Sequence, residues 1–357
     1  MRKQYIDNIR WITVVIVVVY HVIYMFNGVT TFGVIGPFSS NQPQDAFLYL
    51  VYPWFMLLLF VVSGMAARFE LEQTDAKTFL KKRTRKLLIP STVGILVCGW
   101  ILGYYNLLIS GSYNQMAAIP QPVLYVILCL SGIGPLWYIQ MLWIFSVIIV
   151  WIRRIEKDRI WKLCDKAGVI IAVLLTFAIY GSAQILNTPL VVVYRFGIYG
   201  AGFLIGYFLF SHDAVMERLE QKWLLLVLLA VASGVVFIIR YWGMPYPDHE
   251  VLDTFICNVF AWLGTLGVLV FMKKFGGFEN AFSTWMKRQA WGLYIFHYLA
   301  IAASAWYLKL YEPELAPVCV YVLVGICGFG VPLLLNFVVS RIPILRLLLL
   351  GLGKERK

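Results

Sequence analysis

Ten nearly continuous apolar runs dominate this sequence. They cover residues 9–27, 46–67, 87–109, 135–152, 167–186, 190–210, 223–242, 251–272, 290–309 and 317–338. A membrane-spanning helix needs about 20 mostly apolar residues, whereas a strand of a membrane barrel needs about 9–11 that alternate with polar ones. Only 13% of the residues are charged, against about 25% in soluble domains. The sequence therefore predicts an all-α polytopic membrane protein with about ten transmembrane helices and excludes a soluble globular protein.

The basic residues lie almost entirely on one side of the predicted membrane. An even number of helices places both termini on the same side, and if that side is the cytoplasm, the cytoplasmic stretches hold 27 of the 30 Lys and Arg residues. Lys and Arg concentrate in the cytoplasmic segments of membrane proteins. We therefore expect both termini to be cytoplasmic. The net charge of +12 then reflects membrane orientation rather than nucleic-acid binding.

The remaining features of the chain indicate a single membrane domain over residues 1–357. The apolar segment 120–134 is too short to span before the Gly134-Pro135 break, so we expect an interfacial or re-entrant piece on the outer side. The six cysteines are scattered through apolar segments without a CxxC pair, which predicts neither a disulfide nor a metal site.

The first predicted helix places two polar residues on one face. His21 follows Arg10 by eleven residues with no charged residue between them. Eleven steps of 100° come to about 20° past three full turns, so the two side chains share a face and lie about 16 Å apart along the axis. Asp7 precedes Arg10 by three positions and can pair with its guanidinium. The stripe fits either a functional site or an ordinary basic flank with a single buried histidine.

Two further polar residues are predicted at a similar depth in the membrane. His297 lies about 12 Å from the cytoplasmic end of the ninth segment, and Arg195 enters the sixth segment from the outer side. Ionisable groups inside a membrane are costly and line polar cavities or pair with other groups. His21, His297 and Arg195 therefore indicate a cavity between helices. A structural role is the alternative for His297, and for Arg195 it is a partnership with a helix carbonyl or a carboxylate.

A cluster of basic residues, expected in a cytoplasmic loop over 68–86, directly precedes the third segment. Its members are Lys82, Arg83, Arg85 and Lys86. Such a cluster can anchor a helix at anionic lipid headgroups. It equally suits a phosphate-bearing ligand, because arginine binds phosphate oxygens in a bidentate manner. Both interpretations remain open on the sequence.

Four segments combine helix patterns with polar residues in a recognisable order. YIDNIRWITVVIVVVYH contains Arg10, ten residues and then His21. WFMLLLFVVSG ends in Ser63 and Gly64 and is followed by FLKKRTRKLLIP, which ends at Pro90. GPLWYIQMLW contains Trp137, and WGLYIFHYLAI contains His297 three residues after a tyrosine. Together they resemble the integral-membrane acyltransferase family 3, which includes bacterial surface-glycan O-acyltransferases and glucan succinyl-modifying proteins.

The resemblance implies an acyl-CoA donor, carrying an acetyl or succinyl group, on the cytoplasmic side. The acceptor would be a hydroxyl, on a cell-surface carbohydrate or another molecule, that reaches the site from the other side. Four basic residues would hold the donor phosphates: Lys82, Arg83, Arg85 and Lys86. Arg10, held by Asp7, would bind the donor at the cavity mouth, and neutral His21 would deprotonate the acceptor as it attacks the thioester. The cavity lining would include Ser63, Trp137, Arg195 and His297.

The same resemblance implies a multi-pass protein of the bacterial plasma or inner membrane. Its partners would be the lipid bilayer, the acyl-CoA and the acceptor. The sequence itself predicts neither a nucleic-acid partner nor a metal, and a homo-oligomer is compatible with it.

Two other classes of function fit parts of the pattern. A transporter or exporter would use His21, Arg195 and His297 as a proton relay or anion site. Many transporters are built from repeats, however, and the second half of this chain does not repeat the first. A membrane scaffold or sensor would leave the Arg10 and His21 stripe unexplained. No GxSxG, HExxH or GxxxxGKS motif indicates a serine hydrolase, a zinc protease or a P-loop.

Overall fold

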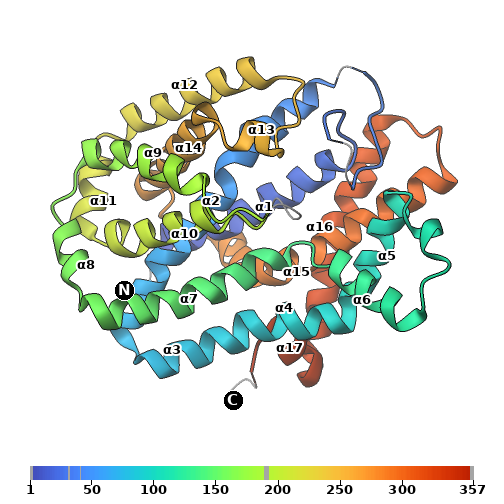
Figure 1. The fold of residues 1–357 in the computed structure, drawn as a ribbon, viewed down its shortest axis with the longest axis horizontal. Helices are drawn as coiled ribbons and strands as arrows, with labels where there is room; N and C mark the ends of the chain where they lie inside the picture. The colour runs from blue at the N-terminus through green and yellow to red at the C-terminus, as the bar shows by residue number, and fades with distance from the viewer. Residues whose placement is uncertain (1–2, 31–32, 41, 189–192, 354–357) are drawn as a thin grey trace. The chain divides into compact units, whose positions relative to one another are not determined.

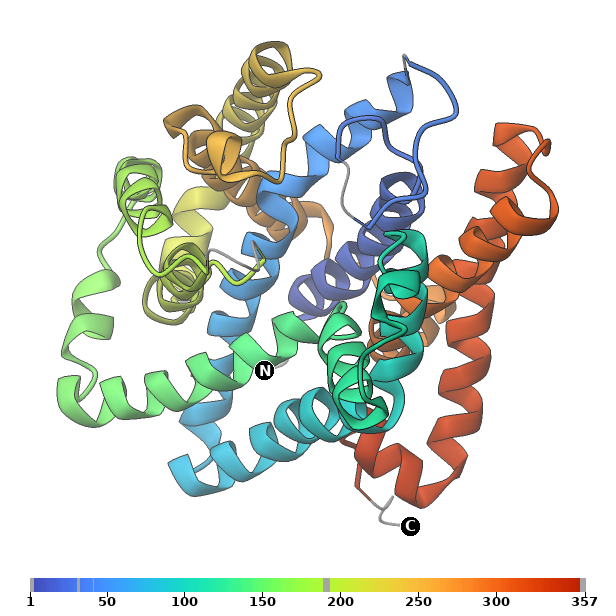
Figure 2. The ribbon, with the colours of Figure 1, turned by 45° about the vertical axis from the view of Figure 1, so that its right-hand side comes forward.

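The computed structural model describes residues 3–30, 33–40, 42–188 and 193–353 (Figures 1 and 2). Within these residues the regular structure is helical, apart from one isolated antiparallel bridge between Asn187 and Arg195. The α-helices are α1 Gln4–Tyr24, α2 Ala46–Gln73, α3 Ala76–Arg83, α4 Ile89–Gly94, α5 Trp100–Ile109, α6 Gln121–Ser131, α7 Leu136–Glu156, α8 Arg159–Cys164, α9 Val169–Ala183, α10 Phe196–Ile205, α11 Asp213–Glu220, α12 Trp223–Tyr241, α13 His249–Leu252, α14 Phe255–Phe275, α15 Ala281–Tyr311, α16 Pro317–Arg341 and α17 Pro343–Leu350. The 3₁₀-helices are η1 Pro43–Asp45 and η4 Tyr113–Met116, and the π-helices are η2 Thr84–Leu88, η3 Ile95–Gly99 and η5 Gly206–Phe210.

In the described residues, each predicted apolar segment overlaps one helix or several successive helices. Among the described residues, seven runs are long and apolar enough to cross a membrane: Gln4–Tyr24, Pro43–Gln73, Ala76–Ile109, Leu136–Glu156, Trp223–Tyr241, Phe255–Phe275 and Pro317–Arg341. The segments 167–186 and 190–210 correspond to shorter apolar helices, and residues 190–192 lie outside the described part. The segment 290–309 lies within the longer α15. The fold is therefore that of an all-α membrane protein, while the count of ten crossings and the side of the termini stay predictions.

The basic stretch before Pro90, expected as a loop, is helical, so this part of the sequence-based expectation is wrong. α3 begins after Asp75, whose carboxylate accepts a hydrogen bond from the Thr78 backbone N–H at 3.0 Å and caps the helix. No glycine or proline interrupts the residues from there to Pro90. Pro90 has no N–H to donate to the carbonyl of Lys86, and the helix widens here into η2 instead of ending. One helical run therefore carries both the basic residues and the third apolar segment.

The chain forms two compact units, each assembled from stretches that are far apart in the sequence. The first unit comprises Met1–Thr13, Tyr49–Lys81 and Met141–Lys287, and the second comprises Val14–Leu48, Lys82–Gln140 and Arg288–Lys357. Long helices such as α1 and α15 contribute residues to both units. The candidate residues are divided in the same way, because Asp7 and Arg10 belong to the first unit and His21 belongs to the second.

Glycines allow close helix packing in the first unit, where α2 meets α10 and η5. A Cβ atom on Gly64 would lie 2.0 Å from the Phe203 carbonyl oxygen, and one on Gly206 would lie 2.0 Å from the Val61 carbonyl oxygen. These distances leave no room for any side chain at the two positions. In the Ser63-Gly64 pair of α2, the glycine is therefore needed for helix packing.

The second unit contains a similar close pair, formed by α5 and α6. A Cβ atom on Gly103 would lie 1.8 Å from the Leu128 carbonyl oxygen, and one on Gly132 would lie 1.7 Å from the Gly99 carbonyl oxygen. The segment 120–134 therefore folds back as a short helix against α5. Its re-entrant or interfacial place in the membrane stays a prediction.

Candidate functional site

Two of the sequence-predicted residues meet in the second unit. His21 lies near the end of α1, and His297 lies in the middle of α15. The two rings have centroids 5.0 Å apart, and Nε2 of His297 lies 3.2 Å from Nδ1 of His21. His297 is fully buried, while His21 is partly buried. The fold thus brings together two histidines that are 276 positions apart in the chain.

Backbone carbonyls determine which nitrogen of each ring carries the hydrogen. His21 Nδ1 lies 2.8 Å from the Val17 carbonyl oxygen, and His297 Nδ1 lies 2.8 Å from that of Tyr294. A carbonyl oxygen only accepts hydrogen bonds, so both Nδ1 atoms are donors when the rings are neutral. His297 Nε2 is then an acceptor for the second branch of the His21 Nδ1–H bond. This arrangement leaves the lone pair on His21 Nε2, away from its partner histidine.

Aromatic rings surround the histidine pair. Tyr298 lies edge-on to His21 at 4.8 Å between centroids, and Tyr20 does so at 5.1 Å. Tyr294, one turn before His297, is buried and donates its hydroxyl hydrogen to the Pro135 carbonyl at 2.6 Å. Of these tyrosines, only Tyr294 belongs to a motif noted in the sequence, as the tyrosine three residues before His297. Tyr298 directly follows His297 on α15, and Tyr20 directly precedes His21 on α1, so adjacency to the two histidines is the signal in the sequence for both.

Asp7 and Arg10 form the ion pair that their spacing predicts. Arg10 Nη1 lies 3.5 Å from Asp7 Oδ1, with the arginine side chain 39% exposed and the aspartate side chain 11% exposed. Asn8, between them, is fully buried and donates to the carbonyls of Gly276 and Phe278 at 2.7 Å each. These contacts fix the start of α1 in the first unit, so that the guanidinium of Arg10 is both oriented and accessible.

The four predicted phosphate-binding residues lie on neighbouring turns of one helical run in the second unit. Lys82 and Arg83 end α3, and Arg85 and Lys86 belong to η2. Three of the four side chains are exposed, those of Lys82, Arg85 and Lys86. The chain contains no acidic residue between positions 82 and 140, so this run carries excess positive charge. Its chemistry suits an anionic ligand with several phosphate oxygens.

Two of the predicted cavity residues, Ser63 and Trp137, lie in different units of the chain. Ser63 is buried within α2 of the first unit. Trp137 is the second residue of α7 and lies in the second unit, and its ring lies edge-on to that of Tyr138 at 6.3 Å between centroids. Tyr138 is in turn 5.6 Å from the ring of Tyr294. Trp137 is therefore linked through aromatic contacts to the neighbour of His297.

Arg195 is buried in the first unit and has a carboxylate partner. Its Nη2 donates to the Leu252 carbonyl at 3.1 Å and lies 3.4 Å from Asp253 Oδ1. Asp253 also accepts a hydrogen bond from His249 Nδ1 at 3.1 Å. This is the partnership with a helix carbonyl and a carboxylate that one interpretation of the sequence anticipates. It gives Arg195 a structural function at the start of α10.

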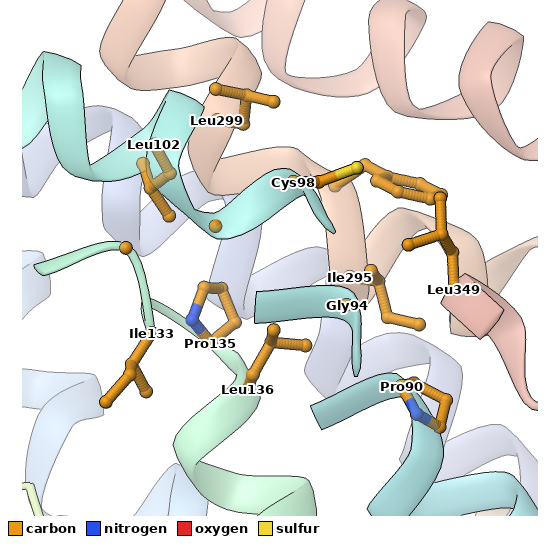
Figure 3. A pocket seen from close by; sticks show the side chains of 13 residues that line it. Pro90, Gly94, Cys98, Leu102, Ile133, Pro135, Leu136, Ile295, Leu299 and Leu349 are labelled. Atoms are coloured by element: carbon orange, nitrogen blue, oxygen red, sulfur yellow. The ribbon is translucent and has the colours of Figure 1, made fainter. Parts of the chain in front are cut away.

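An apolar pocket in the second unit lies between α4, η3, the turn before α7, α15 and α17 (Figure 3). Its lining consists of Pro90, Gly94, Cys98, Gly99, Leu102, Gly132, Ile133, Pro135, Leu136, Ile295, Phe296, Leu299 and Leu349. Ile295 and Leu299 each lie two residues from His297 and hence about 160° around α15 from it. The pocket is therefore on the other side of α15 from the histidine pair.

Comparison with known proteins identifies one family. The model of acyltransferase family 3, described as an acyltransferase domain, matches residues 3–337. No curated protein and no solved structure gives a significant match to the chain. The match includes both histidines, the Asp7 and Arg10 pair and the basic run, whereas α17 lies beyond it.

Proposed function

Since the chain belongs to acyltransferase family 3 and is thus a membrane acyltransferase, we propose that it transfers an acetyl or succinyl group from acyl-CoA to a hydroxyl group. The proposed donor is cytoplasmic, and the proposed acceptor is a carbohydrate of the cell surface. The basic residues on the predicted cytoplasmic side and the histidine deeper in α1 support this direction of transfer.

The histidine pair carries the proposal, with His21 as general base. Its Nδ1–H is engaged by the Val17 carbonyl and by His297 Nε2, which leaves Nε2 as the basic atom. A neutral imidazole held in one tautomer accepts a proton without first reorienting, and a positioned base contributes typically about 10²–10⁴-fold to a rate. The rings of Tyr20 and Tyr298 beside His21 are proposed to limit access of bulk water, which would otherwise compete with the acceptor hydroxyl.

The proposed chemical step is a direct acyl transfer. The acceptor hydroxyl loses its proton to His21 Nε2 while its oxygen attacks the thioester carbonyl carbon. The C–S bond then breaks, and the sulfur of CoA leaves as a thiolate. The proton on His21 passes to that thiolate. The products are an ester of the acceptor and free CoA, and the imidazole is again neutral.

The donor is proposed to bind through its phosphates at the basic run. Exposed guanidinium and ammonium groups in a stretch without carboxylates favour a polyanion. Arg10, oriented by Asp7, is proposed to contact the donor where its pantetheine arm enters the membrane. Lys82, Arg83, Arg85 and Lys86 would bind the nucleotide end.

Calorimetry on the detergent-purified protein tests the donor directly. We expect acetyl-CoA, succinyl-CoA and free CoA to bind, and the double variant Arg83→Ala/Arg85→Ala to lose this binding. Arg341→Ala removes a guanidinium that lies over the Phe337 ring, outside the basic run, and serves as the matched control. A folded wild-type protein that binds none of the three compounds would overturn the acyl-CoA donor.

A further inference from the structure

The C-terminal segment Pro343–Gly353, which lies beyond the family match, packs directly on the basic run. It comprises α17 and the residues Gly351, Leu352 and Gly353, and all of its neighbours named below belong to the second unit. α17 lies against α4, and both helices are seen close together in Figures 1 and 2. The segment therefore borders the residues proposed to bind phosphate.

Specific contacts hold α17 in place. Leu349 and Leu350 are buried in a cluster with Phe296 and Val339. Leu349 also reaches the apolar pocket beside Cys98 (Figure 3). The carbonyl of Leu350 accepts a hydrogen bond from Nε1 of Trp291 at 2.9 Å. These contacts bury the last turn of α17 and determine where the following glycines lie.

Gly351 allows the backbone of the segment to touch the backbone of η2. Its φ is +64°, and a Cβ atom there would lie 2.5 Å from the Arg85 carbonyl oxygen and 2.6 Å from the Lys86 Cα. Both a left-handed backbone and the absence of a side chain are needed at this position. The chain then continues to Gly353, which reaches the Arg85 side chain of η2.

Gly353 lies against the charged end of Arg85. A Cβ atom on Gly353 would lie 2.7 Å from Arg85 Nη1, 2.9 Å from Cζ and 3.1 Å from Nη2. The guanidinium thus rests on the glycine backbone. Lys86 is held in a related manner, because its Nζ lies 5.3 Å from the Trp291 ring whose indole donates to Leu350.

We propose that Pro343–Gly353 is a positioning platform that holds Arg85 and Lys86 for a phosphate group. The charge of the region supports a phosphate ligand, because no acidic residue occurs between positions 82 and 140 or between 315 and 353. Phosphate is shared by CoA and by anionic phospholipid headgroups. The assignment to CoA rests on the proposed function. The platform itself rests on the contacts of Gly351, Gly353 and Trp291.

A substitution at Gly353 is expected to displace mainly the side chain of Arg85. In Gly353→Ala the three atoms nearest to the new methyl group all belong to the flexible end of the Arg85 side chain, so we expect the guanidinium to shift and the backbone to keep its place. Gly330→Ala is the matched control, because a Cβ atom there has no neighbour within 4 Å. Arg85→Ala removes the group that Gly353→Ala displaces, which allows a double-mutant cycle.

The experiment measures CoA and 3′,5′-ADP binding to the full-length protein by calorimetry. We expect Gly353→Ala to weaken binding of both by about 10-fold or more, as expected when a charge-assisted hydrogen bond is lost. Gly330→Ala should bind as wild type does, and both variants should melt at the wild-type temperature. In the Arg85→Ala background, Gly353→Ala should have no further effect. Wild-type affinity in Gly353→Ala, or an equal loss with and without Arg85, would overturn the platform.

A lipid arm separates failure of the platform from failure of the proposed function. Phosphatidylglycerol in mixed micelles is offered to the same variants, and bound lipid is counted by native mass spectrometry. In one outcome, wild type binds no CoA, and Gly353→Ala weakens lipid binding only when Arg85 is present. The platform then stands and the acyl-CoA donor fails. If wild type binds CoA but Gly353→Ala changes neither ligand, the platform fails and the proposed function stands. If wild type binds neither ligand, both fail.

Discussion

His297 Nε2 lies 3.2 Å from His21 Nδ1. The Nδ1 atom of each ring also contacts a backbone carbonyl of its own helix. This relationship makes the two imidazoles different from each other. Both nitrogens of His297 are engaged, one as donor and one as acceptor. His21 has one engaged nitrogen and one with a lone pair available, so His21 is the member of the pair that can take a proton from a substrate.

Replacing His21 with alanine should abolish most of the transfer while leaving donor binding intact. Loss of the base should lower kcat by about 10²–10⁴-fold. The basic run that is proposed to bind the donor is unaltered in His21→Ala. The measurement is transfer of label from radiolabelled acetyl-CoA to carbohydrate in a membrane preparation, with CoA calorimetry beside it. An active His21→Ala enzyme would remove His21 from the mechanism.

His297 should act by positioning His21, so its substitutions should have smaller effects that depend on an acceptor atom. In His297→Phe the second branch of the His21 Nδ1–H bond has no acceptor, and we expect kcat to fall by about 2–10-fold, the worth of a neutral hydrogen bond. His297→Gln supplies an amide oxygen and should recover part of the loss. Equal kcat values for the two variants would show that the acceptor atom is irrelevant.

Ionic strength should weaken the binding of CoA but not that of pantetheine. CoA carries the phosphates that the exposed Lys82, Arg85 and Lys86 are proposed to bind, whereas pantetheine carries none. Raising salt from 0.05 to about 1 M shortens the Debye length to about 3 Å and screens such exposed charges. Calorimetry at several salt concentrations checks this, and a salt-independent CoA affinity would argue against an electrostatic donor site.

Gly64→Ala should destabilise the protein through packing alone. The added Cβ atom would lie 2.0 Å from the Phe203 carbonyl oxygen, which is backbone and must move with its helix. Overpacking of this kind costs about 1–3 kcal/mol. Gly181→Ala is the control, since nothing lies within 4 Å of its Cβ position. Thermal unfolding in detergent should separate the two, with only Gly64→Ala lowering the Tm.

Acid should destabilise the first unit through Asp158. Partial burial opposes ionisation of this carboxyl, but the hydrogen bond from buried Arg68, at 2.5 Å, and the nearby charge of Arg153 outweigh it and lower the pKa of Asp158. A carboxyl with a lowered folded-state pKa contributes stability that is fully present above its ordinary pKa of about 4. This stability is lost as the pH falls below that value through the lower folded-state pKa. The Asp158→Asn variant should be less stable than wild type at neutral pH. Its Tm should also fall less steeply than that of wild type as the pH is lowered. Parallel curves for the variant and wild type would exclude this linkage.

The secondary structure could be predicted from the sequence largely because hydropathy is a local property. In the part of the chain that the structure describes, every predicted apolar segment overlaps helical structure, and the Asp7 and Arg10 ion pair follows from their i,i+3 spacing. The expectation of a loop at the basic stretch is wrong for a related reason. Charge indicates the side of the membrane, but Lys and Arg are also good helix formers, and the Asp75 cap begins a helix there.

The sequence by itself determined a helical membrane protein, its family resemblance and the residue types available for chemistry. Only the tertiary structure brought His297 into contact with His21 and thereby determined that His21 Nε2 is the nitrogen with an available lone pair. The contact between Gly353 and Arg85 likewise depends on the tertiary structure. It also tied Arg195 to Asp253. These contacts join residues far apart in the chain, and they depend on how helix surfaces pack at glycines and on which carbonyl meets which ring. Hydrophobic periodicity specifies which face of a helix is buried, but not the side chain that it meets.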